Sequence, residues 1–286
     1  MIRPAAWRAE PGKEHSVSRQ VDRWRRIGAY LKLQMVLLAG LCAPVLIASS
    51  AQALEPIDTD GPDFVESSEV VPRGRFQYEL DINRERNARV VPATTTTTTP
   101  ALLKYGFADN FEWRIAPNGY QKSDNGSGWS DTALGLKWHA QDRDVEKGRA
   151  AVSWILHADL PSGTSRLRQT GVRPSLRSVI TWELPHDLAL GLMPGFKYDS
   201  SADGHRYGAM IFGAVLNKRI NEQLRVFVEY SGRQIARAAD GGVIASWDVG
   251  AAWLATHDTQ IGIRTGIAAN RNTPNNYLLF EFAQRF

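Results

Sequence analysis

The stretch Arg75–Asn83, R-F-Q-Y-E-L-D-I-N, alternates strictly between apolar and polar side chains from Phe76 onward. The apolar set is Phe76, Tyr78, Leu80 and Ile82, and the polar set is Gln77, Glu79, Asp81 and Asn83. Successive side chains of a β-strand point to opposite faces of the sheet. The stretch therefore predicts a strand with an apolar environment on one face and a polar environment on the other.

The same period-two pattern recurs along the rest of the chain. It appears in the Thr-rich run 93–104 and in the stretches 111–115, 132–139, 152–160, 180–184, 188–198, 206–217, 224–230, 246–253, 261–267 and 278–286. Together these give about 12 strands, most of them close to the 9–11 residues that a tilted strand needs to cross a bilayer.

The links between these stretches alternate in length. Short links with turn residues are expected at 106–110, 185–187 and 256–259, and longer polar links at 121–128, 161–171 and 233–242. Short and long links on opposite ends, with an even number of strands, are typical of outer-membrane barrels. The predicted fold is all-β: a transmembrane up-and-down antiparallel β-barrel over residues 74–286.

The C-terminus fits this prediction, because it ends on an aromatic residue with no polar tail. Leu278, Phe280, Phe282 and Phe286 share one parity, which we expect to face lipid while the last strand pairs with the first. These four residues resemble the C-terminal signal read by the outer-membrane barrel assembly machinery, although Gln284 departs from that pattern.

Alternation alone also fits a soluble β-sandwich or a lipocalin-like carrier. The aromatic residues favour the membrane barrel instead. Tryptophan and tyrosine gather on the apolar parity, as interfacial girdles require; they are Trp113, Trp138, Trp154, Trp182, Trp247, Trp253, Tyr78, Tyr198 and Tyr230.

Residues 1–53 have the layout of a secretory signal peptide exported by the Sec pathway. A basic region precedes the apolar run from Met35, which ends in the cleavage sequence formed by Ala51, Gln52 and Ala53. A permanent transmembrane helix, lipoprotein cleavage before Cys42 and twin-arginine export fit less well, because of Pro44, Leu41 and the missing apolar continuation after Arg26. The expected location is the outer membrane of a Gram-negative cell.

Without the signal peptide, the charge balance changes sign. Residues 1–53 hold 8 of the 34 Lys and Arg and 3 of the 30 Asp and Glu, which leaves 26 basic against 27 acidic side chains. No basic footprint for nucleic acid remains. The remaining chain also has no cysteine, so a disulfide framework and a thiolate metal site are excluded. The acidic segment 54–73 is interpreted as a periplasmic N-terminal extension or as a plug inside the barrel.

Charged side chains of the inward parity are the candidates for lining a lumen, since a basic residue facing the middle of the bilayer costs about 2–4 kcal/mol. They are Glu79, Asp81, Glu112, Arg114, Lys137, His139, Glu183, Lys197, Glu229, Asp248, Arg264 and Glu281. They either pair with one another or form a charged constriction that selects solutes. We also assign Met193, Met210 and Phe212 to the interior.

No catalytic pattern accompanies the scattered histidines, and no motif indicates a cofactor or a metal site. An outer-membrane barrel enzyme and a sealed structural or adhesive barrel remain the alternatives to a channel.

Four blocks of the sequence resemble a known family: residues 66–80, the block T-T-T-T-P-A-L-L-K-Y-G-F-A-D-N-F-E-W-R-I at 96–115, L-R-V-F-V-E-Y at 224–230 and W-D-V-G-A-A-W-L at 247–254. The chain resembles the outer-membrane transporter family of the MetA pathway of phenol degradation over residues 64–286. The resemblance implies a barrel that passes small solutes, among them aromatic or hydrophobic compounds, by passive diffusion through the outer membrane.

Overall fold

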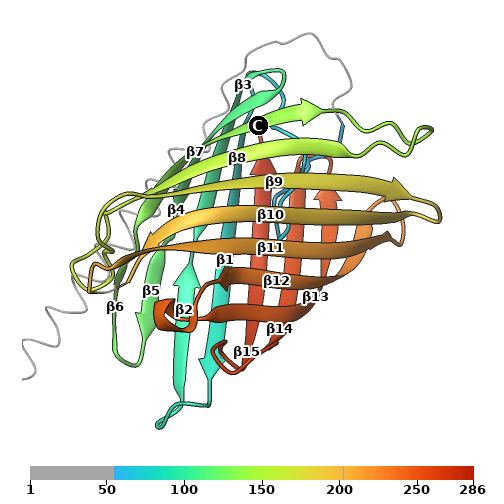
Figure 1. The fold of residues 1–286 in the computed structure, drawn as a ribbon. Coiled ribbons are helices and arrows are strands. Elements are labelled where there is room, and N and C mark those ends of the chain that lie inside the picture. Colours follow the sequence, from blue (N-terminus) through green and yellow to red (C-terminus); the bar gives the residue numbers. More distant parts are fainter. Residues whose placement is uncertain (1–54, 202) are drawn as a thin grey trace, which may run out of the picture. The chain divides into compact units, whose positions relative to one another are not determined.

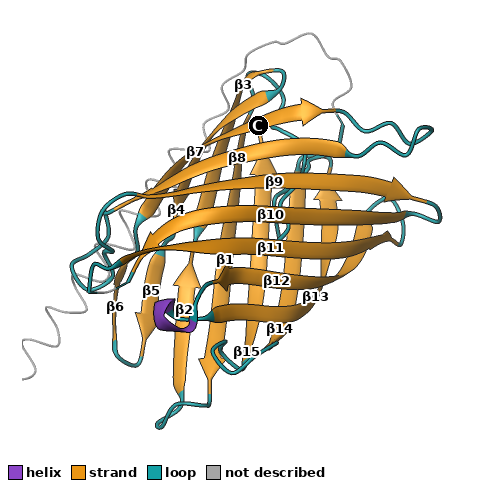
Figure 2. Ribbon diagram, in the orientation of Figure 1, coloured by secondary structure: helices purple, strands orange, loops and turns teal. Residues whose placement is uncertain are grey.

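A computed structural model describes residues 55–201 and 203–286, so the predicted signal peptide at 1–53 lies outside the described residues. The described part is almost entirely β-structure, with a single turn of 3-10 helix, η1 (Ala238–Asp240) (Figure 2). The strands are β1 (Phe76–Asn87), β2 (Thr94–Thr99), β3 (Ala101–Ala108), β4 (Phe111–Pro117), β5 (Tyr120–Ser123), β6 (Gly126–Trp129), β7 (Thr132–Gln141), β8 (Ala151–Leu160), β9 (Arg173–Leu184), β10 (Leu188–Ser200), β11 (Arg206–Arg219), β12 (Leu224–Ile235), β13 (Val243–Thr256), β14 (Thr259–Ala268) and β15 (Asn276–Arg285).

The 15 strands form 12 strands that span the barrel wall, which we call staves, because three of these staves are each interrupted once and so count as two strands. The broken staves are β2 with β3, β4 with β5, and β6 with β7. Pro100 separates β2 from β3, since proline has no N–H for the ladder. In the next stave, Gly119 has φ +76°, and a Cβ there would lie 1.8 Å from the Thr99 carbonyl oxygen. Only glycine fits this crossing. The predicted strand number is confirmed.

The sheet closes on itself through its first and last strands. β1 pairs antiparallel with β15 from Gln77 opposite Arg285 to Arg86 opposite Asn276 (Figure 1). The Phe286 N–H also donates to the Phe76 carbonyl at 2.8 Å. Closure gives the backbone groups of both terminal strands a partner, which a barrel in lipid requires. This confirms the all-β up-and-down antiparallel barrel predicted from the alternation.

Two ends of the barrel can be distinguished by their connections. The short-turn end carries residues 109–110, 185–187, 220–223 and 257–258, together with the longer link 142–150. The long-loop end carries residues 88–93, 161–172, 201, 203–205, 236–242 and 269–275. The expected long link at 121–128 is wrong: these residues belong to the β5–β6 hairpin, which turns at Asp124 and Asn125 and lengthens two staves.

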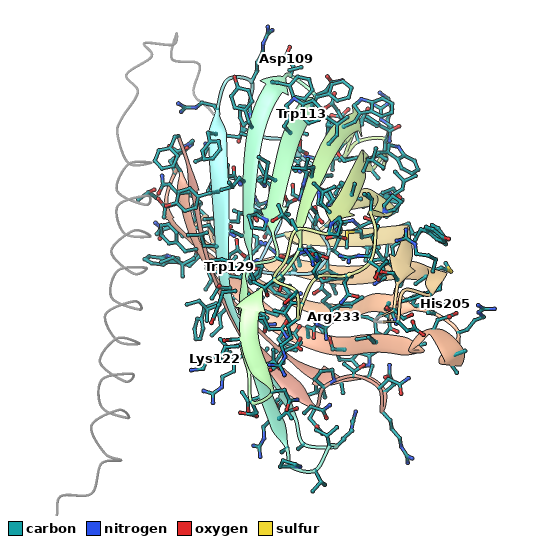
Figure 3. All side chains as sticks on the ribbon, turned by 90° about the vertical axis from the view of Figure 1, so that its left-hand side faces the viewer. Asp109, Trp113, Lys122, Trp129, His205 and Arg233 are labelled. Atoms are coloured by element: carbon teal, nitrogen blue, oxygen red, sulfur yellow. The ribbon has the colours of Figure 1, made fainter. Side chains whose placement is uncertain are left out.

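The outer surface of the barrel is apolar and rich in aromatic rings. Trp113, Trp138, Trp154, Trp247 and Trp253 are 42–55% exposed, and so are many aliphatic side chains of the same parity. Phe107 stacks on Trp113 and Phe111 stacks on Trp138 near the short-turn end. In Figure 3, Asp109 and Trp113 lie toward one end of the barrel and Lys122 toward the other. Such a surface suits lipid, not water.

The inward face contains the buried residues. An apolar cluster there includes Ile155, Val179, Met193, Ile211 and Val215. The prediction for Met210 and Phe212 is wrong, because small and apolar residues of the opposite parity on β11 face inward, and Met210 is 56% exposed on the outer surface.

No helix within residues 55–201 and 203–286 is long and apolar enough to cross a membrane.

Candidate functional site

The lumen of the barrel is occupied by the segment Glu55–Arg73, which we call the lumen segment. It enters at the short-turn end, where the Ile57 N–H donates to the His257 carbonyl at 2.8 Å and Arg285 donates to the Glu55 carbonyl at 2.7 Å. It returns to the same end, where Arg73 forms a parallel bridge with Gly106 just before β1 begins. The lumen segment is thus a loop whose two ends lie at one mouth of the barrel.

Asp60 is the centre of the contacts between this segment and the barrel wall. Its carboxylate lies 2.9 Å from Lys104 Nζ, 3.0 Å from Lys137 Nζ and 3.1 Å from Arg114 Nη2. Its backbone N–H donates to both carboxylate oxygens of Glu79 at 3.1 Å. Asp60 is 5% exposed and the three cations are at most 2% exposed, so this cluster is removed from water.

Three basic side chains of the wall determine the ionisation of Asp60. Burial alone would raise the pKa of the carboxyl, but the charges of Arg114, Lys104 and Lys137 hold that pKa well below its ordinary value. The carboxylate is therefore ionised at neutral pH. Each buried charge in the cluster depends on the others, because an unpaired buried ion is costly.

Two further acidic residues attach the lumen segment to other strands. Glu66 pairs with Arg114 on β4 at 2.6 Å and with Arg177 on β9. Asp63 pairs with Arg225 on β12 at 2.8 Å. The three carboxylates of the segment therefore neutralise basic side chains from strands on different sides of the lumen.

Backbone groups and apolar side chains of the segment are also bound by the wall. Glu229 accepts hydrogen bonds from the N–H groups of Phe64, at 2.8 and 2.9 Å, and of Val65, at 2.7 Å. The Val65 side chain, 4% exposed, packs into the apolar cluster of the inner wall with Met193 and Phe227. This satisfies backbone donors that would otherwise be buried without a partner.

Glycines in the wall make room for the segment. A Cβ at Gly213 would lie 2.6 Å from Val65 Cγ2, and one at Gly262 would lie 2.7 Å from Pro62 Cγ. Atoms essentially never approach so closely, so any other residue at these positions would displace the segment or the wall. The fit between wall and segment thus depends on the absence of two side chains.

The lumen segment separates two cavities. The short-turn cavity has a volume of about 300 Å³ and is lined by residues that include Asp58, Glu183, Asn217 and Arg225. The long-loop cavity has a volume of about 400 Å³ and is lined by residues that include Asp81, Arg173, Lys197 and Arg264. Each is large enough for a small organic molecule or several waters.

The sequence-predicted lumen residues fall into two groups. Seven contact or pack beside the lumen segment: Glu79, Glu112, Arg114, Lys137, His139, Glu229 and Glu281. The other five lie away from it: Asp81, Lys197 and Arg264 line the long-loop cavity, Glu183 lines the short-turn cavity, and Asp248 accepts a hydrogen bond from Ser231 at 2.5 Å.

Several charged contacts of the site were missed from the sequence. Lys104, Arg177 and Arg225 hold the lumen segment, and strand parity would have placed Lys104 inward, opposite to its neighbours Leu103 and Tyr105. Asp60 and Glu66 gave no such signal, because the lumen segment has no period-two pattern. Within the described part of the chain, no group of three or more His, Cys, Asp or Glu side chains is placed to hold a metal ion.

The four C-terminal residues assigned to an assembly signal lie on the outer surface. Leu278, Phe280, Phe282 and Phe286 are 38–50% exposed and alternate with buried residues of β15. Their parity is the lipid-facing parity of the barrel.

The family model described as "Putative MetA-pathway of phenol degradation" matches residues 59–286. The chain belongs to this family. The match includes most of the lumen segment as well as the whole barrel, so both are covered by one family model. No match was found among curated protein sequences.

One solved structure shows the same fold, and two porins are more distantly similar. An outer membrane channel from Pseudomonas putida F1 is 14% identical, with a TM-score of 0.56 over 77% of this chain and 98% of that one. KdgM porin is 12% identical with a TM-score of 0.48, covering 73% and 99%, and NanC porin is 11% identical with a TM-score of 0.48, covering 71% and 97%. The chain therefore has the fold of an outer-membrane β-barrel.

Proposed function

We propose that this protein is a passive outer-membrane channel for small solutes and that the lumen segment closes it in the conformation described. The observation that carries the proposal is the pair of cavities of about 300 and 400 Å³ on the two sides of Glu55–Arg73, inside a closed barrel with an apolar exterior. Displacing the segment toward the short-turn end would join the two cavities into one path.

The proposed solutes are small compounds, among them aromatic or hydrophobic ones. The family description refers to a pathway of phenol degradation, and the inner wall offers an apolar cluster around Met193 and Phe227 that Val65 occupies in the closed state. Passage needs no cofactor and no energy source. We propose no catalytic activity for this chain.

The outward-facing C-terminal side chains are proposed to serve in assembly. Leu278, Phe280, Phe282 and Phe286 form an apolar row, interrupted at Gln284, that a barrel assembly machine would contact before the strand pairs with β1. The lipid of the outer membrane then covers the same row in the folded barrel.

The direct test is single-channel conductance in a planar bilayer. Residues 54–286 and a variant lacking residues 54–70 are refolded in detergent, checked for heat-modifiable migration on a gel and reconstituted. We expect rare openings for the longer chain and stable conductance steps for the shorter one. If the folded shorter chain conducts nothing, the barrel is a sealed structural or adhesive one and the channel proposal is wrong.

A disulfide lock separates the role of the segment from the role of the barrel. Residues 54–286 contain no cysteine, so Val65→Cys with Gly213→Cys introduces the only two thiols. A Cβ at Gly213 would lie 2.6 Å from Val65 Cγ2, which is too close for unbonded atoms but suits two residues joined by a disulfide, so oxidation holds the segment and reduction leaves the two side chains in collision. We expect the oxidised protein to stay closed and the reduced protein to open. Val65→Cys with Gly208→Cys is the matched control, because Gly208 faces outward beside Phe196.

A further inference from the structure

Three basic side chains gather on the outer surface of the barrel near the long-loop end. We call Arg84 and Arg86 on β1 and Lys122 on β5 the outer basic patch; all three are exposed. Arg84 lies opposite Thr97 of β2, and Thr97 lies opposite Lys122. Since neighbouring strands are about 4.8 Å apart, the backbones of Arg84 and Lys122 are about 10 Å apart.

The outer basic patch borders the lipid-facing surface. On β1, the outward residue before Arg84 is Ile82, which is 57% exposed, and Arg84 itself lies opposite Leu278 of β15. On the hairpin, the outward residue before Lys122 is Tyr120, whose ring packs edge-on against Trp129 with the centroids 5.5 Å apart. Apolar and aromatic side chains therefore end where the basic ones begin, which is the level of the lipid headgroups.

The positive charge of the outer basic patch is not neutralised by the protein. Among the described residues, no ion pair or hydrogen bond joins these three side chains to an acceptor. The carboxylate of Asp124, in the turn of the β5–β6 hairpin, accepts a hydrogen bond from the Thr95 N–H at 3.0 Å. Glu85 has the inward parity and pairs with Arg233 at 2.7 Å.

Another outward basic residue of the long-loop end is engaged. Arg206 stacks over the Tyr198 ring at 4.6 Å and donates to the carbonyls of Thr170 and Val172. Its donors are thus used by the protein, whereas those of the outer basic patch remain available to a ligand.

We infer that the outer basic patch binds the phosphorylated headgroup of a glycolipid in the outer leaflet. Arginine presents a planar fork of donors that matches phosphate oxygens. The hydroxyl of Thr97 lies between Arg84 and Lys122 and adds a further donor. The apolar surface below takes the acyl chains, so one lipid contacts both parts of the wall.

The binding test uses bisphosphorylated lipid A and the same lipid with its phosphates removed. Residues 54–286 are refolded in detergent, titrated with each lipid and analysed by native mass spectrometry. The patch variant is Arg84→Gln, Arg86→Gln and Lys122→Gln. The control variant, Lys147→Gln, Arg149→Gln and Arg219→Gln, makes the same change of charge in exposed residues of the short-turn end.

We expect the patch variant to bind bisphosphorylated lipid A about a hundredfold more weakly, because each basic residue beside an anionic surface contributes roughly a fivefold factor. The control variant should bind like the unaltered protein, and removing the phosphates should abolish the difference between the variants. Heat-modifiable migration confirms that each variant is folded.

Three results would overturn the inference. They are equal binding by the patch variant and the unaltered protein, equal weakening in patch and control variants, and equal affinity of the unaltered protein for both lipids. Should the triple variant not fold, binding is measured for the three single substitutions and for the unaltered protein at low and high salt, and these measurements test the same inference. Binding that salt does not weaken would also contradict the inference.

Discussion

Replacing Asp60 by asparagine should release the lumen segment. The substitution keeps the shape of the side chain but removes the charge that faces three buried cations. After the substitution, Lys104 still has an ion pair with Glu79 at 2.5 Å, and Arg114 still has ion pairs with Glu112 and Glu66. Lys137, which is fully buried, has no second carboxylate partner among the described residues.

The loss of stability of the closed state is estimated from the buried charge of Lys137, which the substitution leaves without a carboxylate partner. Removing one partner of a buried ion pair costs about 3–5 kcal/mol. Asparagine still offers an acceptor oxygen, so we take the lower value, about 3 kcal/mol. This cost applies only to the closed state, because water reaches Lys137 once the segment has left. The closed-to-open ratio should fall by roughly a hundredfold, since 1.4 kcal/mol corresponds to a factor of ten.

Labelling of a cysteine at position 65 measures this ratio. Val65 is 4% exposed in the closed state, so a water-soluble maleimide reacts with Val65→Cys only when the segment opens, at a rate proportional to the open fraction. Adding Asp60→Asn should accelerate labelling about a hundredfold. Glu69→Gln is the control, because Glu69 is more exposed and lies 3.8 Å from His139.

Two results would refute this reasoning. Either Asp60→Asn leaves the labelling rate unchanged, or Glu69→Gln accelerates it equally. A second substitution strengthens the test: Lys137→Met removes the stranded charge and should return the Asp60→Asn variant to slow labelling. If the double variant labels as fast as Asp60→Asn alone, the cost does not come from Lys137.

Three other predictions follow from the same structure. Gly262→Val places carbon atoms where Pro62 packs, so we expect larger or more frequent conductance steps; unchanged steps would mean that the close contact is relieved locally. The pKa of Asp60 is lower in the closed state than in the open state, where it has the ordinary value of about 3.9. Asp60 therefore stabilises the closed state fully above about pH 3.9, and this stabilisation is lost as the pH falls through the lower pKa of the closed state. The difference in conductance between Asp60→Asn and the unaltered protein should therefore persist from pH 7 to about 4 and vanish only at more acidic pH, and a difference that vanishes near pH 6 would contradict the role of Asp60. Val249→Arg, on the lipid face of β13, should lower the free energy of unfolding in liposomes by about 2–4 kcal/mol, whereas Ile267→Arg near the end of β14 should cost about 0–1 kcal/mol; equal costs would place the bilayer elsewhere.

The barrel could be predicted because the chain lies between lipid and lumen along nearly its whole length. Every stave must then alternate, and the alternation in Arg75–Asn83 is the same signal as in Tyr277–Phe286. The β5–β6 hairpin was not predicted, because its Gly126 and Gly128 and its polar neighbours have the composition of a loop. Pairing with the neighbouring stave outweighs that composition.

The lumen segment could not be placed from the sequence. Its acidic residues are equally consistent with a solvated extension, and their partners lie far along the chain. Asp60 binds Lys104 and Lys137, which are 44 and 77 positions away, and Phe64 binds Glu229, which is 165 positions away. Such contacts can be identified only once the arrangement of the strands around the barrel is known.

The course of the lumen segment, which enters and leaves by the same mouth, determines how it would respond to mechanical force. Tension applied at Glu55 from the short-turn side would load the contacts of Ile57, Asp60 and Asp63 one after another, not all at once. Contacts that break in sequence yield at lower force than the same contacts sheared together. A channel closed in this way is strong against random thermal opening and weak against a directed pull from the side of its own N-terminal segment.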